Sequence, residues 1–530
     1  MRFLFHVVTS LALGEGALAA FGLSSTSSRF VVDTDAGLVF EVNRANGDIT
    51  SLKYNGVEYQ GTSKASAINS GLGTSTVTGE TVGVYVKITV KSGSLPVTHY
   101  YVAKPKEATI YMATYITGEV DPGELRWLAR LRTSELPTGV HGDVGDTRGC
   151  EAFEGKDTFK CTNGQTRCKM YTSDRFIDDK VHGVSGSRAA VWMIMPGTAY
   201  ETSASGPFMR DINSQTGGSD QELYWYMNSG HVRTEPWRFG LQGPYAMAFT
   251  SLSAKPIENL DTSFFSDLGI QGYVSSSGRG SVSGKATGIP SQFETVLHWH
   301  NTQAQYWTKA STDGSYKSPL MKPGVYTMKL YKSEFLVAND SMTITAGQTA
   351  SKDIVSKEAD TAVLWRIGEF DGQPFELKNG DKITRMHPSD VRMGSWGGTY
   401  TVGQSTAKDF PMTLWSKGTG TTTATVNFEI TEKQVKSHVL RIGTTLSFKT
   451  GRPLVKIGGW TGSDPGAPKL IDSRGVTRGA YRGYGEVYTW NVPASAFKIG
   501  TNTLTVGVSG NGDATWLSAN YIVDALELQD

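Results

Sequence analysis

The chain has 530 residues, and its 51 Lys and Arg side chains are nearly balanced by 50 Asp and Glu side chains. This balance excludes the overall positive charge typical of proteins that bind nucleic acid or an anionic membrane surface. At about 150 residues per domain, the length predicts three or four domains. The 61 Gly, 22 Tyr and 12 Trp residues favour short strands and turns, so we expect an all-β protein.

The N-terminus is predicted to be a secretory signal peptide. Arg2 supplies a positive charge, Phe3 to Leu13 is a short apolar run, and Ala17 to Ala19 offers a small-residue cleavage site. We therefore expect residues 1–19 to be removed and the mature chain to be secreted into the extracellular space. The alternative is an ordinary buried N-terminal segment. No later apolar run is long enough to cross a bilayer, so no membrane partner is expected.

Residues 20–272 are predicted to form a first β-sandwich domain. From about Phe30 to Thr117, apolar residues alternate with polar ones between Gly, Asn and Asp turns, without an amphipathic helix. The following part, Gly123 to Tyr245, is richer in Arg, Trp, Tyr and Asp. Functional loops often have such a composition.

Two arginines share one face of a predicted strand at residues 123–132. Arg126 and Arg130 alternate with Trp127 and Ala129, which places the guanidinium groups together. The planar fork of arginine matches a carboxylate, so this face could hold an acidic substrate. The alternative is a solvated charged face.

Three cysteines lie close together in the sequence. We predict a disulfide between Cys150 and Cys161 and a free thiol at Cys168. A zinc site is not expected, because no paired CxxC or nearby HxxxH is present.

Residues 166–179 contain a candidate proton acceptor, Lys169, which we expect to share a face with Tyr171. A lysine with an ordinary pKa of about 10.4 cannot act as a base at neutral pH, because an ammonium group has no lone pair. Neighbouring cations or burial would have to lower this pKa, and Arg126 and His231 are the candidates to do so.

Arg210, Asp211 and Asn213 are predicted to lie on a polar loop that closes over a ligand, or on a simple connector. After it, Tyr224 and Tyr226 share one strand face, and a turn places His231 at the strand end. These groups suit a sugar-binding surface. A half-buried strand with a capping histidine is the alternative.

Residues 273–356 are predicted to form a small sandwich the size of a fibronectin type III module. Tyr326, Met328 and Leu330 alternate after a Pro-Gly turn, as in a strand with one buried face. The sequence Asn339-Asp340-Ser341 predicts N-glycosylation of Asn339.

Residues 357–530 are predicted to form a jelly-roll sandwich, because short strands follow one another without helix periodicity. Glu369 near its start and Asp524 near its end could share a structural calcium ion with backbone carbonyls, or they could be solvated acids.

Three arginines recur every four residues in the third block. They could bind uronates in a polymer, or they could fasten domains to each other. They are Arg474, Arg478 and Arg482.

Six segments in order resemble the fungal rhamnogalacturonan lyases of polysaccharide lyase family 4. They are GELRWLARL, the lysine-containing segment before DRFIDD, GPFMRDINS, YWYMNSGH, RMHPSD and DSRGVTRGAYRG. The resemblance extends from about Phe21 to Leu528. It implies a catalytic β-sandwich, a fibronectin type III-like domain and a jelly-roll that resembles a carbohydrate-binding module.

The resemblance also implies β-elimination on rhamnogalacturonan I, at the bond from rhamnose to O4 of galacturonate. The family's catalytic lysine and histidine fall on Lys169 and His231, its carboxylate-binding arginine on Arg126, and its site tyrosines on Tyr224 and Tyr226. One sequence does not separate the base from the acid. No metal cluster is evident, so we expect no catalytic cofactor. We also expect a monomer, with the polysaccharide as its partner.

Two competing functions are considered. A hydrolase would use two carboxylates, and the acids available for it are Asp174, Asp178, Asp179 and Asp211. A non-catalytic pectin-binding protein would use Tyr224, Tyr226 and the Arg126 face for binding alone.

Overall fold

The computed structural model describes residues 20–530 except 253, 419, 421 and 513–514. Its regular elements are strands and short 3-10 turns, so the all-β prediction is confirmed. The predicted signal peptide at residues 1–19 lies outside the described residues. None of the helical turns in the described part has the length and apolar character needed to cross a membrane.

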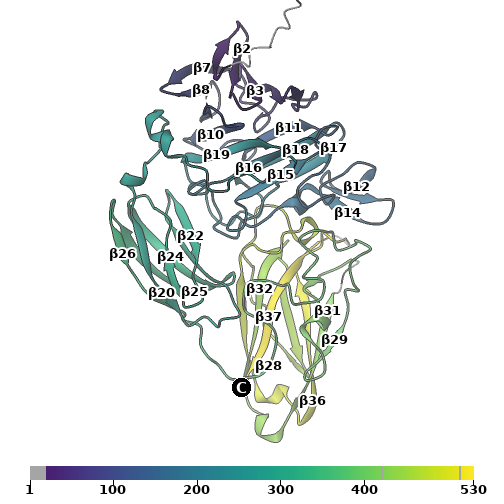
Figure 1. The fold of residues 1–530 in the computed structure, drawn as a ribbon. Coiled ribbons are helices and arrows are strands. Elements are labelled where there is room, and N and C mark those ends of the chain that lie inside the picture. The colour runs from purple at the N-terminus through teal and green to yellow at the C-terminus, as the bar shows by residue number, and fades with distance from the viewer. Residues whose placement is uncertain (1–19, 253, 419, 421, 513–514) are drawn as a thin grey trace, which may run out of the picture.

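Four sheets make up the first domain (Figure 1). In spatial order, the first sheet consists of β1 (Gly22–Ser25), β2 (Arg29–Asp33), β3 (Leu38–Asn43), β4 (Ile49–Tyr54) and β5 (Val57–Glu58). The second sheet consists of β15 (Val181–Ser185), β16 (Ala190–Ile194), β19 (Gly240–Thr250), β10 (Thr109–Ile116), β9 (Val97–Ala103), β8 (Tyr85–Ser92) and β7 (Ser75–Val82). The third sheet consists of β17 (Ser214–Gly217), β18 (Asp220–Ser229), β11 (Glu124–Arg132) and β6 (Ala67–Ile68), and the fourth of β12 (Cys150–Glu154), β13 (Thr158–Cys161) and β14 (Thr166–Cys168).

Two small sheets form the second domain. They consist of β23 (Ser315–Lys317), β20 (Ser281–Thr287), β26 (Thr349–Ser351) and β27 (Ile354–Val355), and of β22 (Gln305–Lys309), β21 (Thr295–His300), β24 (Gly324–Lys332) and β25 (Phe335–Ile344). As the alternation predicted, Tyr326, Met328 and Leu330 of β24 are buried in the core of this domain.

Two larger sheets face each other in the third domain. They consist of β28 (Val363–Gly368), β37 (Asn520–Gln529), β32 (His438–Phe448), β35 (Glu486–Val492) and β30 (Thr413–Trp415), and of β29 (Thr399–Thr401), β31 (Thr423–Ile430), β36 (Gly500–Ser509), β33 (Arg452–Ile457) and β34 (Trp460–Thr461). Figure 1 shows this domain below the first, with the second domain to one side.

The first and third domains share a continuous apolar core. Met170 and Tyr171 of the first domain belong to the same cluster as Val476 and Tyr481 of the third, and the Tyr171 hydroxyl donates to the carbonyl of Thr477 at 2.8 Å. Burial of these side chains stabilises the contact. The two domains therefore form one packed unit around the segments that carry Lys169 and Arg474.

Candidate active site

The antiparallel pair β11 and β18 carries the aromatic and basic residues of the site. Arg126 lies directly opposite Tyr226, and Trp127 lies opposite Trp225. Because side chains alternate along a strand, Tyr224 joins Arg126 and Tyr226 on one face. The two tryptophans occupy the other face and are buried. The predicted division into a polar-aromatic face and a core face is confirmed.

The Arg126 guanidinium is held against two phenol rings. Its Cζ atom lies 5.3 Å from the Tyr226 ring centroid and 5.8 Å from that of Tyr224. The guanidinium donates hydrogen bonds to the Tyr226 hydroxyl and to the Glu124 carboxylate. The Arg126 side chain is 17% exposed and that of Arg130 is 6% exposed, so this is not a solvated charged face. These contacts hold the guanidinium in one position, which suits Arg126 to bind a carboxylate.

His231 follows the end of β18 and is buried among charged groups. Its Nδ1 lies 3.0 Å from Asp211 Oδ1, and its Nε2 lies 3.2 Å from Glu124 Oε1. Arg474 Nη2 lies 2.9 Å from the same Nε2. Burial lowers the pKa of His231 and Arg474 lowers it further, but Asp211 and Glu124 outweigh both, so this pKa is raised above its ordinary value.

The backbone is strained on both sides of this contact. Val232 has φ of 47°, and Arg474 has φ of 57°. A β-branched residue rarely adopts this left-handed region, so the surrounding packing must hold Val232 in place. The residue after His231 and the arginine that contacts it thus both adopt left-handed backbone conformations.

Lys169 lies in a 3-10 turn at Lys169–Thr172 instead of a strand. Its Nζ is 3.4 Å from Asp157 Oδ1, while Tyr171 is fully buried in the opposite direction. The prediction that the two side chains share a face is therefore wrong, because a 3-10 turn has a period of three residues instead of two. Arg474 Nη2 lies 3.2 Å from the other oxygen of Asp157.

Lys169 pairs with an acid, Asp157. The positive charge of Lys169 also lowers the pKa of Glu124. The expected influence of Arg126 and His231 on this amine stays a prediction. A chain of contacts nevertheless joins the predicted residues, in the order Arg126, Glu124, His231, Arg474, Asp157 and Lys169.

Sequence reasoning missed two members of this chain, Glu124 and Asp157. Glu124 could have been found, because it lies two residues before Arg126 and so shares its strand face. Burial raises the pKa of Glu124, but His231 and Arg126 outweigh it and bring this pKa to about 2. Asp157 lies in the turn between β12 and β13, and no local pattern pointed to it.

The three arginines of the third domain have different roles. Arg474 contacts His231 at the site. Arg478 donates to the Glu154 carbonyl of the first domain at 3.0 Å, and Arg482 Nε lies 3.0 Å from Glu334 Oε2 of the second. Arg478 and Arg482 therefore fasten domains together.

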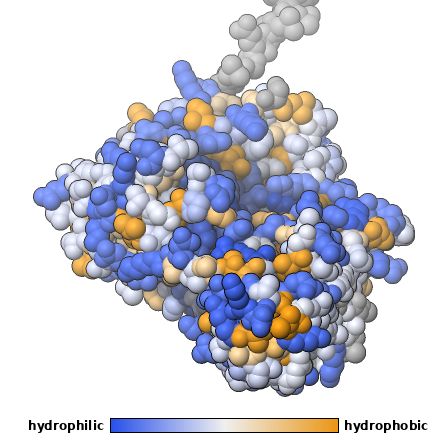
Figure 2. All heavy atoms as spheres, turned by 90° about the horizontal axis from the view of Figure 1, so that it is seen from below, coloured by the Kyte–Doolittle hydropathy of each residue, from blue (hydrophilic) through white to orange (hydrophobic). Residues whose placement is uncertain are grey.

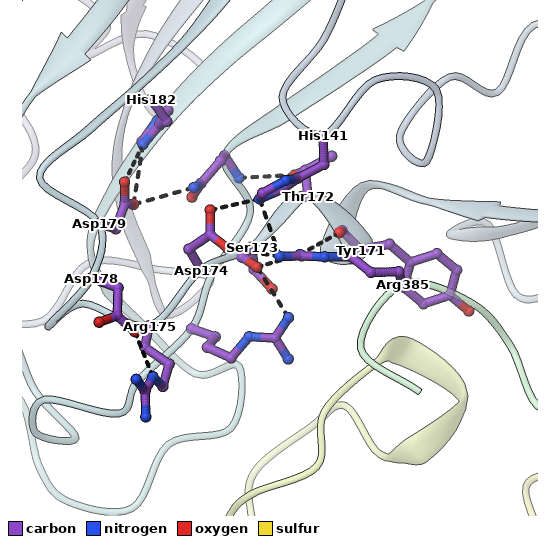
Figure 3. A network of polar contacts seen from close by, with 12 residues as sticks. His141, Tyr171, Thr172, Ser173, Asp174, Arg175, Asp178, Asp179, His182 and Arg385 are labelled. Atoms are coloured by element: carbon purple, nitrogen blue, oxygen red, sulfur yellow. Dashed lines mark hydrogen bonds and ion pairs between the residues drawn. The ribbon is translucent and has the colours of Figure 1, made fainter. Parts of the chain in front are cut away.

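Each of the four acids considered for a hydrolase lies in an ion pair with an arginine or histidine side chain. Figure 3 shows three of these pairs. Arg385 Nη2 lies 2.7 Å from Asp174, Arg175 Nε lies 2.6 Å from Asp178, and His182 Nδ1 lies 2.8 Å from Asp179. Asp211 pairs with His231. The structure gives no support to the pair of free carboxylates that a glycosidase uses.

His182 supports the tyrosine strand from behind. Its Nδ1 donates to Asp179, and its Nε2 donates to the Tyr224 carbonyl at 2.6 Å. Both partners are acceptors, so both ring nitrogens carry hydrogens. Burial lowers the pKa of His182, but the Asp179 carboxylate outweighs it, and this pKa is raised. A buried imidazolium thus fixes the backbone of Tyr224.

The segment with Arg210, Asp211 and Asn213 is buried beneath the site. Arg210 donates to the Gly479 carbonyl of the third domain at 2.8 Å and to the Ser173 carbonyl at 3.0 Å. The prediction of a loop that closes over a ligand is wrong, because these polar groups are bonded to the protein. Asp211 instead orients His231.

Cys150 and Cys161 form a disulfide across the β12–β13 hairpin, as predicted, and Cys168 is a buried free thiol. Asn339 is exposed on β25, so its glycosylation stays a prediction.

The suggested calcium ligands have other neighbours. Glu369 Oε2 lies 3.6 Å from Arg366 Nη1. Burial and the Asp371 carboxylate raise the pKa of Asp524 well above its ordinary value. In the part of the chain that the structure describes, no three His, Cys, Asp or Glu side chains are grouped to hold a metal ion. A calcium ion between Glu369 and Asp524 stays a prediction.

Comparison with known proteins gives a consistent result along the chain. Residues 21–272 match the family model for the N-terminal part of rhamnogalacturonan lyase B, and residues 278–352 and 363–528 match domains II and III of polysaccharide lyase family 4. The chain is 50% identical to the rhamnogalacturonate lyase A of Emericella nidulans, covering 99% of both chains. It is 49% identical to that of Aspergillus aculeatus, covering 97% of both. A probable rhamnogalacturonate lyase A from Aspergillus clavatus is 50% identical over the full length of both chains.

Proposed function

Because the chain belongs to polysaccharide lyase family 4 and is a polysaccharide lyase, we propose that it cleaves rhamnogalacturonan I by β-elimination. The bond broken joins rhamnose to O4 of galacturonate, and the product carries an unsaturated galacturonate at its new non-reducing end. The observation that supports this best is the network joining Arg126, His231 and Lys169. It combines a carboxylate-binding cation with two proton-transfer groups.

Arg126 neutralises the uronate carboxylate in this proposal. Removal of the C5 proton places further charge on a group that is already an anion, so the step needs a fixed positive charge. Arg126 is held by Glu124 and two phenols before substrate arrives. It therefore pays little reorganisation cost during the reaction.

We assign His231 as the acid and Lys169 as the base. The raised pKa of His231 favours its protonated form, and that form can donate a proton to the departing O4. Lys169, at the other end of the chain of contacts, acts in its neutral form and abstracts the C5 proton. The electron pair of the C5–H bond forms the C4=C5 double bond as the C4–O4 bond breaks, and the departing oxygen takes its proton from His231. In this proposal Tyr224 and Tyr226 border the sugar site and hold its charged groups in place, since their hydroxyls bond Glu222 and Arg126.

We propose that this catalysis uses no cofactor, since Arg126 supplies the charge that the elimination requires. We also propose that residues 1–19 direct secretion, that Asn339 is glycosylated, and that the enzyme acts as an extracellular monomer. The predicted signal peptide supports secretion, and the Asn339-Asp340-Ser341 sequon supports glycosylation.

The test is to incubate the purified protein with rhamnogalacturonan I, with homogalacturonan as the control. We expect new reducing ends together with ultraviolet absorbance from a C4=C5 double bond, with rhamnogalacturonan I alone. New ends without the absorbance would mean hydrolysis and would refute the proposal.

A further inference from the structure

A cavity lies where the three domains meet. It has a volume of about 570 Å³ and is separate from the candidate catalytic residues. Figure 2 views the molecule from below and shows a hollow with hydrophilic surface near the centre of that face. All three domains contribute to the cavity wall, with Gly206 and Glu235 from the first, His298 and Lys329 from the second, and Arg482 and Tyr484 from the third. Its size is in the range of small-ligand sites.

Two histidines of β21 line this cavity without satisfying their hydrogen-bonding capacity. His298 and His300 share a strand face, with ring centroids 5.0 Å apart. His298 is 3% exposed, and neither of its ring nitrogens has a partner at hydrogen-bond geometry among the described residues, although the Gln305 side chain lies close enough to raise its pKa. Nε2 of His300 also lacks one there. Buried polar atoms without partners are costly, so they point to a ligand that supplies them.

The backbone is shaped to admit the His298 ring. A Cβ atom on Gly206 would lie 3.3 Å from His298 Cε1, and Gly206 has φ of 79°. Both the tight space and the left-handed conformation favour glycine at this position. The loop from the first domain thus packs closely on the ring.

Positive charge surrounds the two imidazoles. Lys329 of β24 lies directly opposite His298 in the sheet. Burial and the charge of Lys329 lower the pKa of His300 to about 4, and burial also lowers the pKa of Lys329. The acids of the cavity wall have other partners: Glu235 pairs with Arg238 at 2.8 Å, Glu334 pairs with Arg482 at 3.0 Å, and Asp524 accepts backbone hydrogen bonds from Gly372 and Gln373. Among the described residues, Lys329 has no ion-pair partner, so a bound anion would supply one, whereas a metal cation would be repelled by it.

The opposite wall adds a guanidinium group. Arg482 lies with its Cζ atom 4.8 Å from the Phe208 ring centroid, and its Nε is 3.0 Å from Glu334. Tyr484 contributes a half-buried ring whose hydroxyl donates to the Thr234 carbonyl at 2.8 Å. Aromatic rings beside a set of nitrogen donors suit a sugar that carries a carboxylate.

We propose that the cavity between the domains binds an acidic oligosaccharide, with a uronate carboxylate held by His298, His300 and Lys329. The carboxylate accepts hydrogen bonds from the imidazole N–H groups and an ion pair from the amine. The choice of a galacturonate-containing oligosaccharide rests on the proposed function. The choice of an anion rests on the cavity itself.

Binding is measured by titration calorimetry in an Arg126→Met background, which removes the carboxylate contact of the catalytic site. The ligand is an acidic tetrasaccharide made from rhamnogalacturonan I by partial acid hydrolysis, so its preparation does not depend on this enzyme. The comparison ligands are the same tetrasaccharide with its carboxylates reduced to alcohols, and inorganic phosphate.

We expect one molecule of acidic tetrasaccharide per chain and at least tenfold weaker binding of the reduced form. Adding Lys329→Met should weaken binding at least tenfold. Lys317→Met, at an exposed lysine on β23 of the same domain, should leave it unchanged. The single variant Lys329→Met should keep its lyase rate within twofold of wild type, which reports a correct fold. If this variant does not fold, His300→Gln provides the same test.

Three results would overturn the proposal: no binding in the Arg126→Met background, binding that neither Lys329→Met nor His300→Gln weakens, or phosphate binding as tight as that of the tetrasaccharide. The last result would leave a simple anion site. Absence of lyase activity in the wild type would refute the proposed catalytic function instead, because calorimetry does not depend on turnover.

Discussion

Arg474 of the third domain donates a hydrogen bond to His231 of the first domain, with 2.9 Å between Nη2 and Nε2. An arginine has no acceptor, so this bond requires a lone pair on Nε2. Glu124, 3.2 Å from the same nitrogen, instead favours a proton there. The third domain therefore takes part in setting the protonation state of the candidate acid.

Replacing Arg474 tests this coupling. Arg474 lowers the pKa of His231, so Arg474→Met should raise that pKa. If protonated His231 is the acid, activity falls as pH rises through its pKa, and this limb of the pH profile should move to higher pH. We also expect a loss of roughly 10-fold to 100-fold in kcat/KM at neutral pH, because positioning is lost.

The control for Arg474 is Arg452→Met, which removes a guanidinium of the third domain that pairs with the exposed Asp464. Its pH profile should match wild type. An unchanged profile in Arg474→Met would show that the contact with His231 does not act during turnover.

Asp211→Asn should move the profile in the opposite direction. The Asp211 carboxylate raises the pKa of His231 from 3.0 Å away, and asparagine keeps the shape without the charge. Because a smaller fraction of His231 is then protonated at a given pH, the limb on which activity falls with rising pH should move to lower pH. Steady-state rates of Asp211→Asn and Arg474→Met across the same pH series would show whether their pH profiles move in opposite directions. Shifts in the same direction would contradict the assignment of His231 as the acid.

Lys169→Met and His231→Gln should each reduce kcat by about 10² to 10⁴. Lys169 is partly exposed in a 3-10 turn, so its loss should leave the melting temperature close to that of wild type. The rate of double-bond absorbance on rhamnogalacturonan I is the readout, with circular dichroism as the check on folding. A folded Lys169→Met enzyme with the wild-type rate would remove this lysine from the mechanism.

His182 should contribute stability that depends on pH. Its folded pKa is raised, because Asp179 outweighs burial. The stabilisation is therefore fully present below the ordinary histidine pKa of about 6.5 and is lost as pH rises through the folded value. His182→Gln should cost about 3 kcal/mol at low pH, because it leaves Asp179 buried without its cation, and less at high pH.

Denaturant unfolding of His182→Gln and wild type between pH 5 and pH 9 would measure this difference. His141→Gln is a suitable control, since His141 pairs with Asp174 in the neighbouring network but is 37% exposed (Figure 3). A difference between His182→Gln and wild type that is constant across the pH range would mean that His182 is not a buried imidazolium.

The strand pair at the heart of the site was predictable from local alternation. Arg126, Tyr224 and Tyr226 lie on one face because a strand has a period of two residues, and Trp225 fills the core on the other. The Cys150–Cys161 disulfide was also correctly predicted, from the spacing of three cysteines. These features depend on short segments alone.

The sequence by itself determined the all-β class, the order of the family motifs and the residues of the tyrosine strand, because periodicity and motif order are written along the chain. Tertiary structure alone decided that Lys169 faces Asp157 and that Arg474, 243 residues after His231, completes the site. The same holds for the cavity at which His298, Lys329 and Arg482 meet. Contacts between domains depend on how whole sandwiches pack, and no local pattern encodes that packing.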